Sequence, residues 1–449
     1  MTSLFPRNFK KSFPTAIRGE GSWIFSSDDQ KYLDASGQAA VVSIGHGVRS
    51  VADAMATGAS QIAFAHTTQF HSASAERLAA RLLALAPPNF ANGRVYFTSG
   101  GSEATETAIK LARQFHIECG APQKFRVVSR RQSYHGSTLG AMSVSGNVAR
   151  RAPYQPLLSE WGHIAPCFCY HCPFDKTFPT CKVACAEDLD SFLSADDPST
   201  VSAFIFEPVV GATLGAAAPP EGYVQRIAEI CRKRNILLIA DEIMTGMGRT
   251  GKPFAVGHWS SEIGTVEPDL ILVGKGIASG YAPLGAVLIS SKVSEAFAKG
   301  SGVFQHGFTY QAHPVSTAAG NAVLDVLEEN NLFARVEPAA AQLRESLEPL
   351  VAHPHVGEIR GLGLLLGIEF VKDKSTREPF LKEENIAEKI RQSAQKKSVL
   401  TYPTQGCVDG LRGDHILLAP PFIITAEESQ LIAEALQFAL QQVFSSNLR

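Results

Sequence analysis

The sequence predicts an α/β fold, with a large domain built on a mainly parallel sheet flanked by helices and a smaller α+β domain. Two observations carry this prediction. Short runs of apolar and β-branched residues recur along the central two-thirds of the chain, and amphipathic helical patterns lie between several of them. Strands that are buried on both faces lack the alternation of half-exposed strands, and alternation of strands with helices is typical of parallel sheets.

The strand segments of the large domain are short and nearly continuous in apolar residues. They are residues 94–99, 125–130, 201–209, 236–242, 269–274 and 285–290. Between them, residues 102–116 and 222–234 place their apolar side chains along one side, as an amphipathic helix does. We therefore expect a sheet with helices on both faces.

The end of the chain has a different pattern. Apolar residues 356–370 predict a strand pair that turns at Gly361 and Gly363. The last helix begins at Thr425, where Glu428 completes a capping box. Further helices are expected near residues 317–329, 335–351 and 384–397. These elements predict a second domain, with the boundary near residue 315.

Composition excludes several classes of protein. Of the 449 residues, 45% are hydrophobic and 19% charged, which is ordinary for a globular enzyme. The net charge of −2 provides no basic field for nucleic acid or an anionic membrane, and no segment approaches the length of a membrane-spanning helix. The first residues lack the apolar core of a secretory signal. We expect a cytoplasmic protein with mostly reduced cysteines.

Two loops in the large domain are suited to binding a ligand. Gly100 and Gly101 follow a predicted strand, and a helix begins at Ser102. Glycines and the free N–H groups of a helix start make a phosphate site, although a plain turn with Ser102 as N-cap is the alternative. Tyr134 and His135 lie on the loop after the next strand, where they are placed to cover a flat ring or to form a surface turn.

Two other strand ends carry charges. Asp241 and Glu242 follow a buried strand, where an acid is costly without a partner. A positively charged ring nitrogen is one such partner; a helix cap or an ion pair is the alternative. Lys275 lies between two glycines after another buried strand. Partial desolvation there lowers the pKa of a lysine and leaves a neutral amine nucleophile.

One ligand needs all four features, and that ligand is pyridoxal 5′-phosphate. Its phosphate needs N–H donors, its ring needs packing on both faces, its pyridine nitrogen needs an acid and its aldehyde needs a lysine. Ligands of open parallel sheets bind at the carboxyl ends of the strands, where all four features lie.

The sequence resembles the class III, or ω-type, aminotransferases, which are pyridoxal-phosphate enzymes of the aspartate aminotransferase fold (fold type I). The resemblance extends from residue 19 to residue 425. The segments that carry it are FTSGGSEA, EPVVGA, ADEIMTGMGRTG, PDLILVGKGIASGYAPLGA and HGFTYQAHP. It implies a sheet of the seven-stranded type in a cofactor-binding domain at 51–315, and a small domain formed by residues 1–50 and 316–449.

The resemblance also implies the roles of the residues around the cofactor ring. Lys275 binds the cofactor covalently and later moves a proton between the substrate and the cofactor. Asp241 pairs with the pyridine nitrogen. Ile243 packs on one face of the ring and Tyr134 on the other, with His135 beside it.

The remaining cofactor residues follow in the same way. Gly101 and Ser102 hold the phosphate, and Glu207 stands near the cofactor, where it pairs with an arginine in some relatives. Thr309 is expected to reach the phosphate of the neighbouring subunit, which implies a homodimer with shared active sites.

The chain departs from the family pattern at three places. Val210 replaces a glutamine that contacts the cofactor ring in many relatives. Ala39 and Ala40 stand where several amine-specific relatives carry a bulky aromatic residue, which suggests room for a bulky or long amine donor. Arg412, before Gly413, is the candidate for binding a substrate carboxylate, with an exposed loop arginine as the alternative.

The expected reaction is a ping-pong transfer of an amino group from an amine or ω-amino acid to a keto acid, for which pyruvate is favoured. An enzyme linked to 2-oxoglutarate, of the 4-aminobutyrate or ornithine type, is the main alternative. A silent pyridoxal-fold scaffold is disfavoured by the intact lysine, aspartate and phosphate loop.

A zinc-organised protein is the alternative from another class. It would use the segment 167–185, which holds five of the eight cysteines and His171. The spacing of these residues fits common zinc patterns poorly, and we expect no catalytic metal. The pairs Cys167–Cys172 and Cys181–Cys185 are candidates for oxidation in vitro.

Overall fold

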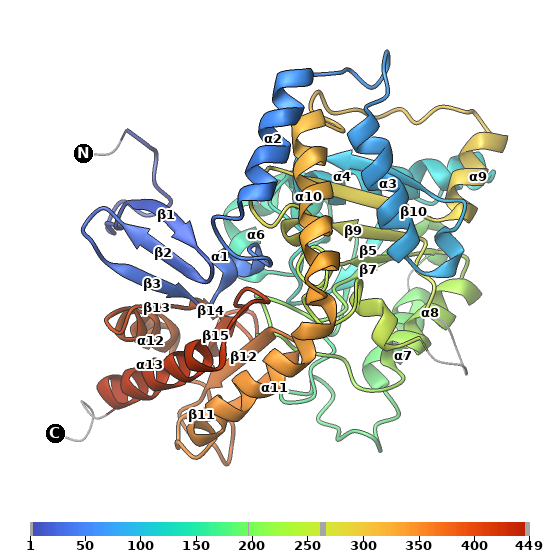
Figure 1. Ribbon diagram of the computed structural model, residues 1–449. Coiled ribbons are helices and arrows are strands. Elements are labelled where there is room, and N and C mark those ends of the chain that lie inside the picture. Colours follow the sequence, from blue (N-terminus) through green and yellow to red (C-terminus); the bar gives the residue numbers. More distant parts are fainter. Residues whose placement is uncertain (1–2, 196, 261–265, 445–449) are drawn as a thin grey trace.

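A seven-stranded sheet forms the centre of the molecule in the computed structural model, which describes residues 3–195, 197–260 and 266–444 (Figure 1). Its strand order is β4-β10-β9-β8-β7-β5-β6. The strands are β4 (Arg94–Thr98), β5 (Arg126–Arg130), β6 (His163–Ile164), β7 (Val201–Phe206), β8 (Leu237–Asp241), β9 (Leu270–Val273) and β10 (Gly285–Ile289).

All neighbouring strands in this sheet pair in parallel except at β10, which runs antiparallel to both β4 and β9. Every residue of β7, β8, β9 and β10 is buried. This two-sided burial explains why these strands are apolar throughout. The predicted fold class and all six predicted strands are confirmed. Strand β6 was missed because two residues are too few to show a pattern.

Helices cover both faces of the large sheet. Helix α4 packs against β9, β10, β4 and β7, whereas α10 packs against α2 and α3 (Figure 1). The helices before residue 300 are α1 (Gly37–Ala40), α2 (Arg49–Gln61), α3 (Ala73–Leu85), α4 (Gly101–Glu118), α5 (Leu139–Val144), α6 (Val148–Arg151), α7 (Ala184–Ala195), α8 (Tyr223–Lys233) and α9 (Ser291–Lys299).

Two four-stranded sheets lie beside the large one, with strand orders β1-β2-β3-β13 and β11-β12-β15-β14. The expected strand pair and capping box are present; in the cap, the Thr425 N–H donates to Glu428 and the Glu428 N–H to the Thr425 hydroxyl. The elements are β1 (Ala16–Glu20), β2 (Trp23–Ser26), β3 (Lys31–Asp34), α10 (Pro314–Glu329), α11 (Leu332–Val351), β11 (Val356–Leu362), β12 (Leu365–Phe370), α12 (Ile386–Gln395), β13 (Val399–Leu400), β14 (Tyr402–Gln405), β15 (Asp414–Leu418) and α13 (Ala426–Phe444).

The first sheet joins the two ends of the chain, since the C-terminal strand β13 pairs with the N-terminal strand β3. A small domain built from both ends is consistent with this pairing. Helix α10 begins at Pro314 and continues through residue 315, so no break in secondary structure marks a boundary there. The domain boundaries at residues 50 and 315 stay a prediction.

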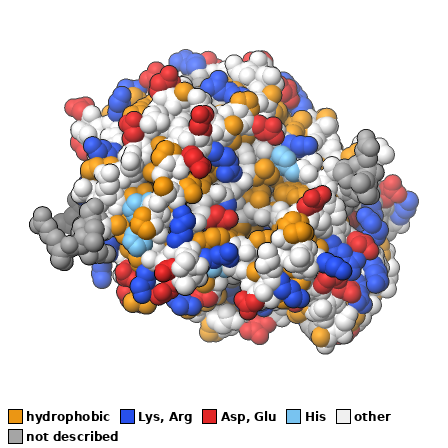
Figure 2. All heavy atoms as spheres, turned by 90° about the horizontal axis from the view of Figure 1, so that it is seen from below, with side chains coloured by type: hydrophobic (Ala, Val, Ile, Leu, Met, Phe, Trp, Pro, Cys, Tyr) orange, Lys and Arg blue, Asp and Glu red, His pale blue; other side chains and the backbone are white. Residues whose placement is uncertain are grey.

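The surface mixes charges of both signs. Figure 2 shows basic and acidic side chains interspersed on one face, as a net charge of −2 would lead one to expect. In the described part of the chain, no helix combines the length and apolarity needed to cross a membrane.

A buried carboxylate on strand β12 links the cysteine-containing segment 167–185 to that strand. Glu369 on β12 is fully buried and accepts hydrogen bonds from Arg360 at 2.7 Å and from His171 at 2.6 Å. Burial alone would raise the pKa of Glu369, but His171 and Arg360 together hold it below its usual value. Glu369 therefore links the segment 167–185, through His171, to strands β11 and β12.

Replacing Glu369 by Ala should destabilise the protein by about 3–5 kcal/mol, because it removes the only buried acid that pairs with the buried Arg360 among the described residues and leaves Glu358, which is about one-third exposed, as its remaining partner. The matched control is Glu378→Ala, which removes an exposed partner of Lys372 and should cost no more than about 1 kcal/mol. Urea unfolding followed by circular dichroism would compare the two midpoints. Equal shifts for the two variants would contradict the structural role of Glu369.

Candidate active site

A cavity of about 190 Å³ opens at the carboxyl ends of strands β7, β8 and β9. Eight of the predicted site residues line this one cavity, although they come from segments more than 170 positions apart. They are Gly101, Ser102, Tyr134, His135, Glu207, Asp241, Ile243 and Lys275. Sequence reasoning missed the other lining residues, which have no distinctive pattern: Gly136, Val209, Ala212 and Met244.

Lys275 follows β9 with a left-handed backbone, at a φ of 46°. Its Nζ donates a hydrogen bond to the carbonyl oxygen of Ala39 at 2.9 Å. Desolvation in the cavity lowers the pKa of Lys275 to about 8, although the nearby acids Asp241 and Glu207 oppose this shift. The lysine is thus poised between its charged and its nucleophilic form near neutral pH.

The segment that supplies the Ala39 carbonyl is conformationally unusual. Gln38, Ala39 and Ala40 all have positive φ values, which cost about 1–2 kcal/mol per residue outside glycine. The fully buried Asp34 stabilises this turn, because its Oδ1 accepts hydrogen bonds from the N–H groups of Ser36 and Gln38. No sequence pattern marks such a turn.

Asp241 ends β8 with its carboxylate in the cavity. Its Oδ1 accepts from the Ile243 N–H at 3.1 Å, and its Oδ2 lies 2.6 Å from His135 Nδ1. His135 is fully buried, and its Nε2 has no hydrogen-bond partner among the described residues. The histidine therefore orients the acid and leaves a buried polar atom that a ligand or water can satisfy.

Glu207 is held by backbone groups. Its two carboxylate oxygens accept from the N–H groups of Tyr134 and Gly211, each at 3.0 Å. Burial raises the pKa of Glu207. Arg130 donates to the backbone carbonyl oxygen of Glu207, not to its carboxylate, whose hydrogen bonds among the described residues come from the two backbone N–H groups.

The start of α4 forms the expected cradle. Helix α4 begins at Gly101, so Ser102 is inside the helix and the alternative of Ser102 as N-cap is wrong. The Ser102 hydroxyl accepts from the Ser137 N–H at 3.0 Å. A Cβ on Gly136 would lie 2.7 Å from that hydroxyl, and one on Gly101 would lie 2.8 Å from Ile243. Both glycines are therefore needed for the close packing of the cradle.

These residues fit pyridoxal phosphate. The cavity offers an acid, Asp241, and an amine, Lys275, with apolar walls at Ile243 and Val209 and free N–H groups at the start of α4. The unpartnered Nε2 of His135 provides a further polar contact.

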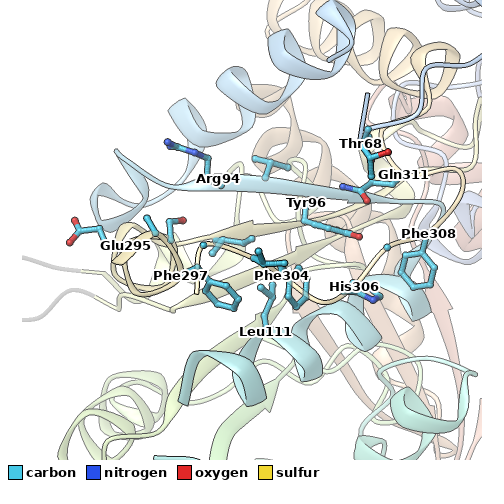
Figure 3. A pocket seen from close by; sticks show the side chains of 18 of the residues that line it. Thr68, Arg94, Tyr96, Leu111, Glu295, Phe297, Phe304, His306, Phe308 and Gln311 are labelled. Carbon is cyan, nitrogen blue, oxygen red and sulfur yellow. The ribbon is translucent and has the colours of Figure 1, made fainter. Parts of the chain in front are cut away.

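Three other predicted residues lie outside this cavity. Thr309 lines a separate cavity of about 910 Å³ with Tyr96, Phe304 and His306 (Figure 3). Arg412 lies on an exposed loop, where its Nε donates to Asp409 at 2.7 Å. Ala40 is buried in the core.

The departures from the family pattern at Ala40 and Val210 were expected to enlarge the substrate pocket and to remove a cofactor contact. Neither side chain lines the cavity. Ala40 packs in a cluster with Val209 and Ala419, so its side chain does not line the cavity. Val210 packs with Phe168 and Leu214, and its neighbour Val209 lines the cavity instead.

The cysteines lie apart from this site. Cys167 and Cys185 are in contact, with their sulfur atoms 3.8 Å apart, a pairing that differs from both pairs considered from the sequence. Within residues 3–195, 197–260 and 266–444, no group of three or more His, Cys, Asp or Glu side chains is placed to hold a metal.

Comparison with known proteins decides the family. The model of the family "Aminotransferase class-III" matches residues 5–440. The chain belongs to the class III aminotransferases. An uncharacterized aminotransferase of Bacillus subtilis, YodT, is 38% identical over 428 residues, which cover 95% of both chains.

Two further relatives bear on the substrate. Diaminobutyrate–2-oxoglutarate transaminase of Halomonas elongata is 33% identical over 433 residues, covering 95% of this chain and 89% of the relative. An amine transaminase from an uncultivated Pseudomonas species, solved in its PLP-bound form, matches with a TM-score of 0.90 and 34% identity, covering 98% of each chain. The protein is thus a pyridoxal-phosphate-dependent aminotransferase.

Covalent attachment of pyridoxal phosphate to the apoenzyme should become faster with rising pH and level off above about pH 8. Only the neutral amine attacks, and the pKa of Lys275 is lowered to about 8. Borohydride trapping followed by mass spectrometry of the labelled peptide measures the rate. Glu207→Gln should move the midpoint to lower pH, because the charge of Glu207 raises the pKa of Lys275. Labelling of the same peptide in Lys275→Ala, or a midpoint near the ordinary lysine value, would contradict the assignment.

Proposed function

We propose that this aminotransferase transfers an amino group from an apolar amine, or an ω-amino acid, to pyruvate by a ping-pong mechanism. The main support for this proposal is the composition of the cavity wall. Lys275 is the only cationic side chain among the residues that line it, and Val209, Ala212, Ile243 and Met244 provide apolar surface. Such a wall suits a donor without an acidic group near the reacting carbon.

The residue roles form part of this proposal. Bound pyridoxal phosphate supplies the electron sink that makes amino transfer possible. Lys275 holds the cofactor and carries the proton at its Nζ during transfer. Asp241, oriented by His135, keeps the ring nitrogen charged. Glu207 fixes the loop at Tyr134 through its hydrogen bond to the backbone.

Tyr134 and Ile243 are proposed to enclose the ring between them, since both line the cavity. Gly101 and Ser102 are proposed to bind the phosphate at the start of α4. A helix start offers N–H groups and a positive dipole end, which suit a doubly charged phosphate.

We also propose a homodimer, with cytoplasmic localisation as expected from the composition. Thr309 does not line the cavity of its own chain, although the family resemblance gives it a phosphate contact. It is exposed and lines the separate cavity in which Tyr96 stacks with His306 (Figure 3). A second subunit that covers this region would receive Thr309 in its own site.

A linkage to 2-oxoglutarate is the second candidate, favoured by the name of the Halomonas relative. A dicarboxylate acceptor needs two cationic partners, and Lys275, the one lysine or arginine among the described lining residues, is proposed to hold the cofactor instead. Arg412 would have to leave Asp409 to serve as one of them. The bulky or long-chain amine donor expected from Ala39 and Ala40 has no support in the cavity wall, because neither side chain lines it.

The acceptor is tested by supplying purified holoenzyme with a panel of arylalkyl and aliphatic amines and either pyruvate or 2-oxoglutarate. We expect alanine to form from pyruvate at a rate at least tenfold above the rate of glutamate formation, because the wall lacks a second cation. Chromatography of the derivatised amino acids measures both products, and Lys275→Ala is the blank. Faster formation of glutamate would overturn the pyruvate assignment, and no product from any pair would overturn the proposed reaction.

A further inference from the structure

Arg150 lies against Tyr134, which lines the cavity, although Arg150 is not itself one of the lining residues. It lies in the short helix α6, one residue before its end, and its guanidinium carbon is 4.5 Å from the centre of the Tyr134 ring. Tyr134 is itself one of the residues that line the cavity. The guanidinium of Arg150, although exposed, therefore rests on a residue of the cavity wall.

The charge of Arg150 has no partner among the described residues. Only its backbone N–H is used, in a 3.0 Å hydrogen bond to the Asn147 side chain that caps the helix. The adjacent Arg151, by contrast, donates to the carbonyl oxygens of Ser143 and Ser145. Arg150 also acts on the active site directly, since its charge contributes to lowering the pKa of Lys275.

Arg412 lies on the loop next to α6 but is differently placed. Gln132 fixes this loop through the carbonyl oxygens of Gly406 and Cys407, and Gly410 packs on Val148 of α6 so closely that a Cβ would lie 2.7 Å from it. Within the loop, Arg412 is paired with Asp409. A substrate carboxylate would have to displace Asp409 to reach it.

The position of Arg150 over the Tyr134 ring suits the binding of a carboxylate. A guanidinium that lies over an aromatic ring keeps its N–H groups free in its own plane, where they form two parallel hydrogen bonds with a carboxylate. Stacking also reduces the side-chain freedom that is lost on binding.

We propose that Arg150, rather than Arg412, binds the carboxylate of the keto-acid acceptor and of its amino-acid product beside Tyr134. This inference rests on the proposed function, because a keto acid and an amine donor share the site in turn. It makes Arg150 a specificity-determining residue that acts on only one of the two substrates.

Steady-state kinetics of Arg150→Met, which keeps an apolar stem on Tyr134, tests the proposal. We expect the KM for pyruvate to rise at least about tenfold, as the loss of a charged hydrogen bond predicts, while the KM for a carboxylate-free amine changes less than about twofold. Arg150→Lys should fall between the two. The matched control Arg412→Met should leave both KM values within about twofold.

A binding measurement separates this role from a structural one. Propionate, a carboxylate without a keto group, should bind to the wild-type holoenzyme in calorimetry and bind at least about tenfold more weakly to Arg150→Met. Unchanged propionate and pyruvate affinities in Arg150→Met, or equal losses for pyruvate and amine, would overturn the proposal. A wild-type enzyme that turns over no amine with pyruvate would overturn the proposed function instead, and propionate binding would still report on Arg150.

Discussion

One constraint organises this molecule, which is that a lysine and two acids are enclosed in a single small cavity. Lys275, Asp241 and Glu207 lie at the carboxyl ends of three neighbouring parallel strands. The register of β8 and β9 places Asp241 opposite Leu272, three residues before the lysine. Each charged group is costly to desolvate alone, and each is supported by a group from another segment: Asp241 by His135 and Glu207 by two backbone N–H groups.

Segments outside the large sheet contribute to the same constraint. The N-terminal segment presents the Ala39 carbonyl to Lys275 from a left-handed turn that the buried Asp34 stabilises. Arg249, which is also buried, donates to the carbonyl oxygens of Val42, Leu364 and Pro420. Burial lowers the pKa of Arg249 to about 9, although Asp34 opposes this shift. One guanidinium thus ties three segments together around the cavity.

The parts of the site that were predictable from sequence lie at the ends of strongly apolar strands. Next to such a strand, three features are unexpected: an acid, a lysine flanked by glycines, or a pair of glycines. A residue that does not suit its apolar surroundings indicates a functional site. Three other features gave no such signal in the sequence. They are the Ala39 carbonyl, the Cys167–Cys185 contact and the lack of an ion-pair partner for Arg150 among the described residues. They depend on how distant loops pack, and neither periodicity nor composition encodes that packing.

Arg412 and Arg150 illustrate this difference well. Arg412 was identified by its place in a family pattern, yet in the fold its charge is paired with Asp409. Arg150 lies on a four-residue helix that shows no pattern at all, yet in the fold it lies on Tyr134 and has no ion-pair partner among the described residues. Charge pairing and stacking, which only the tertiary structure provides, distinguish the two arginines.

The central claim is that Asp241, oriented by His135, keeps the cofactor ring charged opposite Lys275. Nitrogen-15 NMR spectroscopy of the holoenzyme, loaded with pyridoxal phosphate labelled at the ring nitrogen, tests this claim most directly. The account predicts a protonated ring nitrogen in the wild-type enzyme at neutral pH and an unprotonated one in Asp241→Asn. An unprotonated nitrogen in the wild-type enzyme, or the same signal in both proteins, would contradict it.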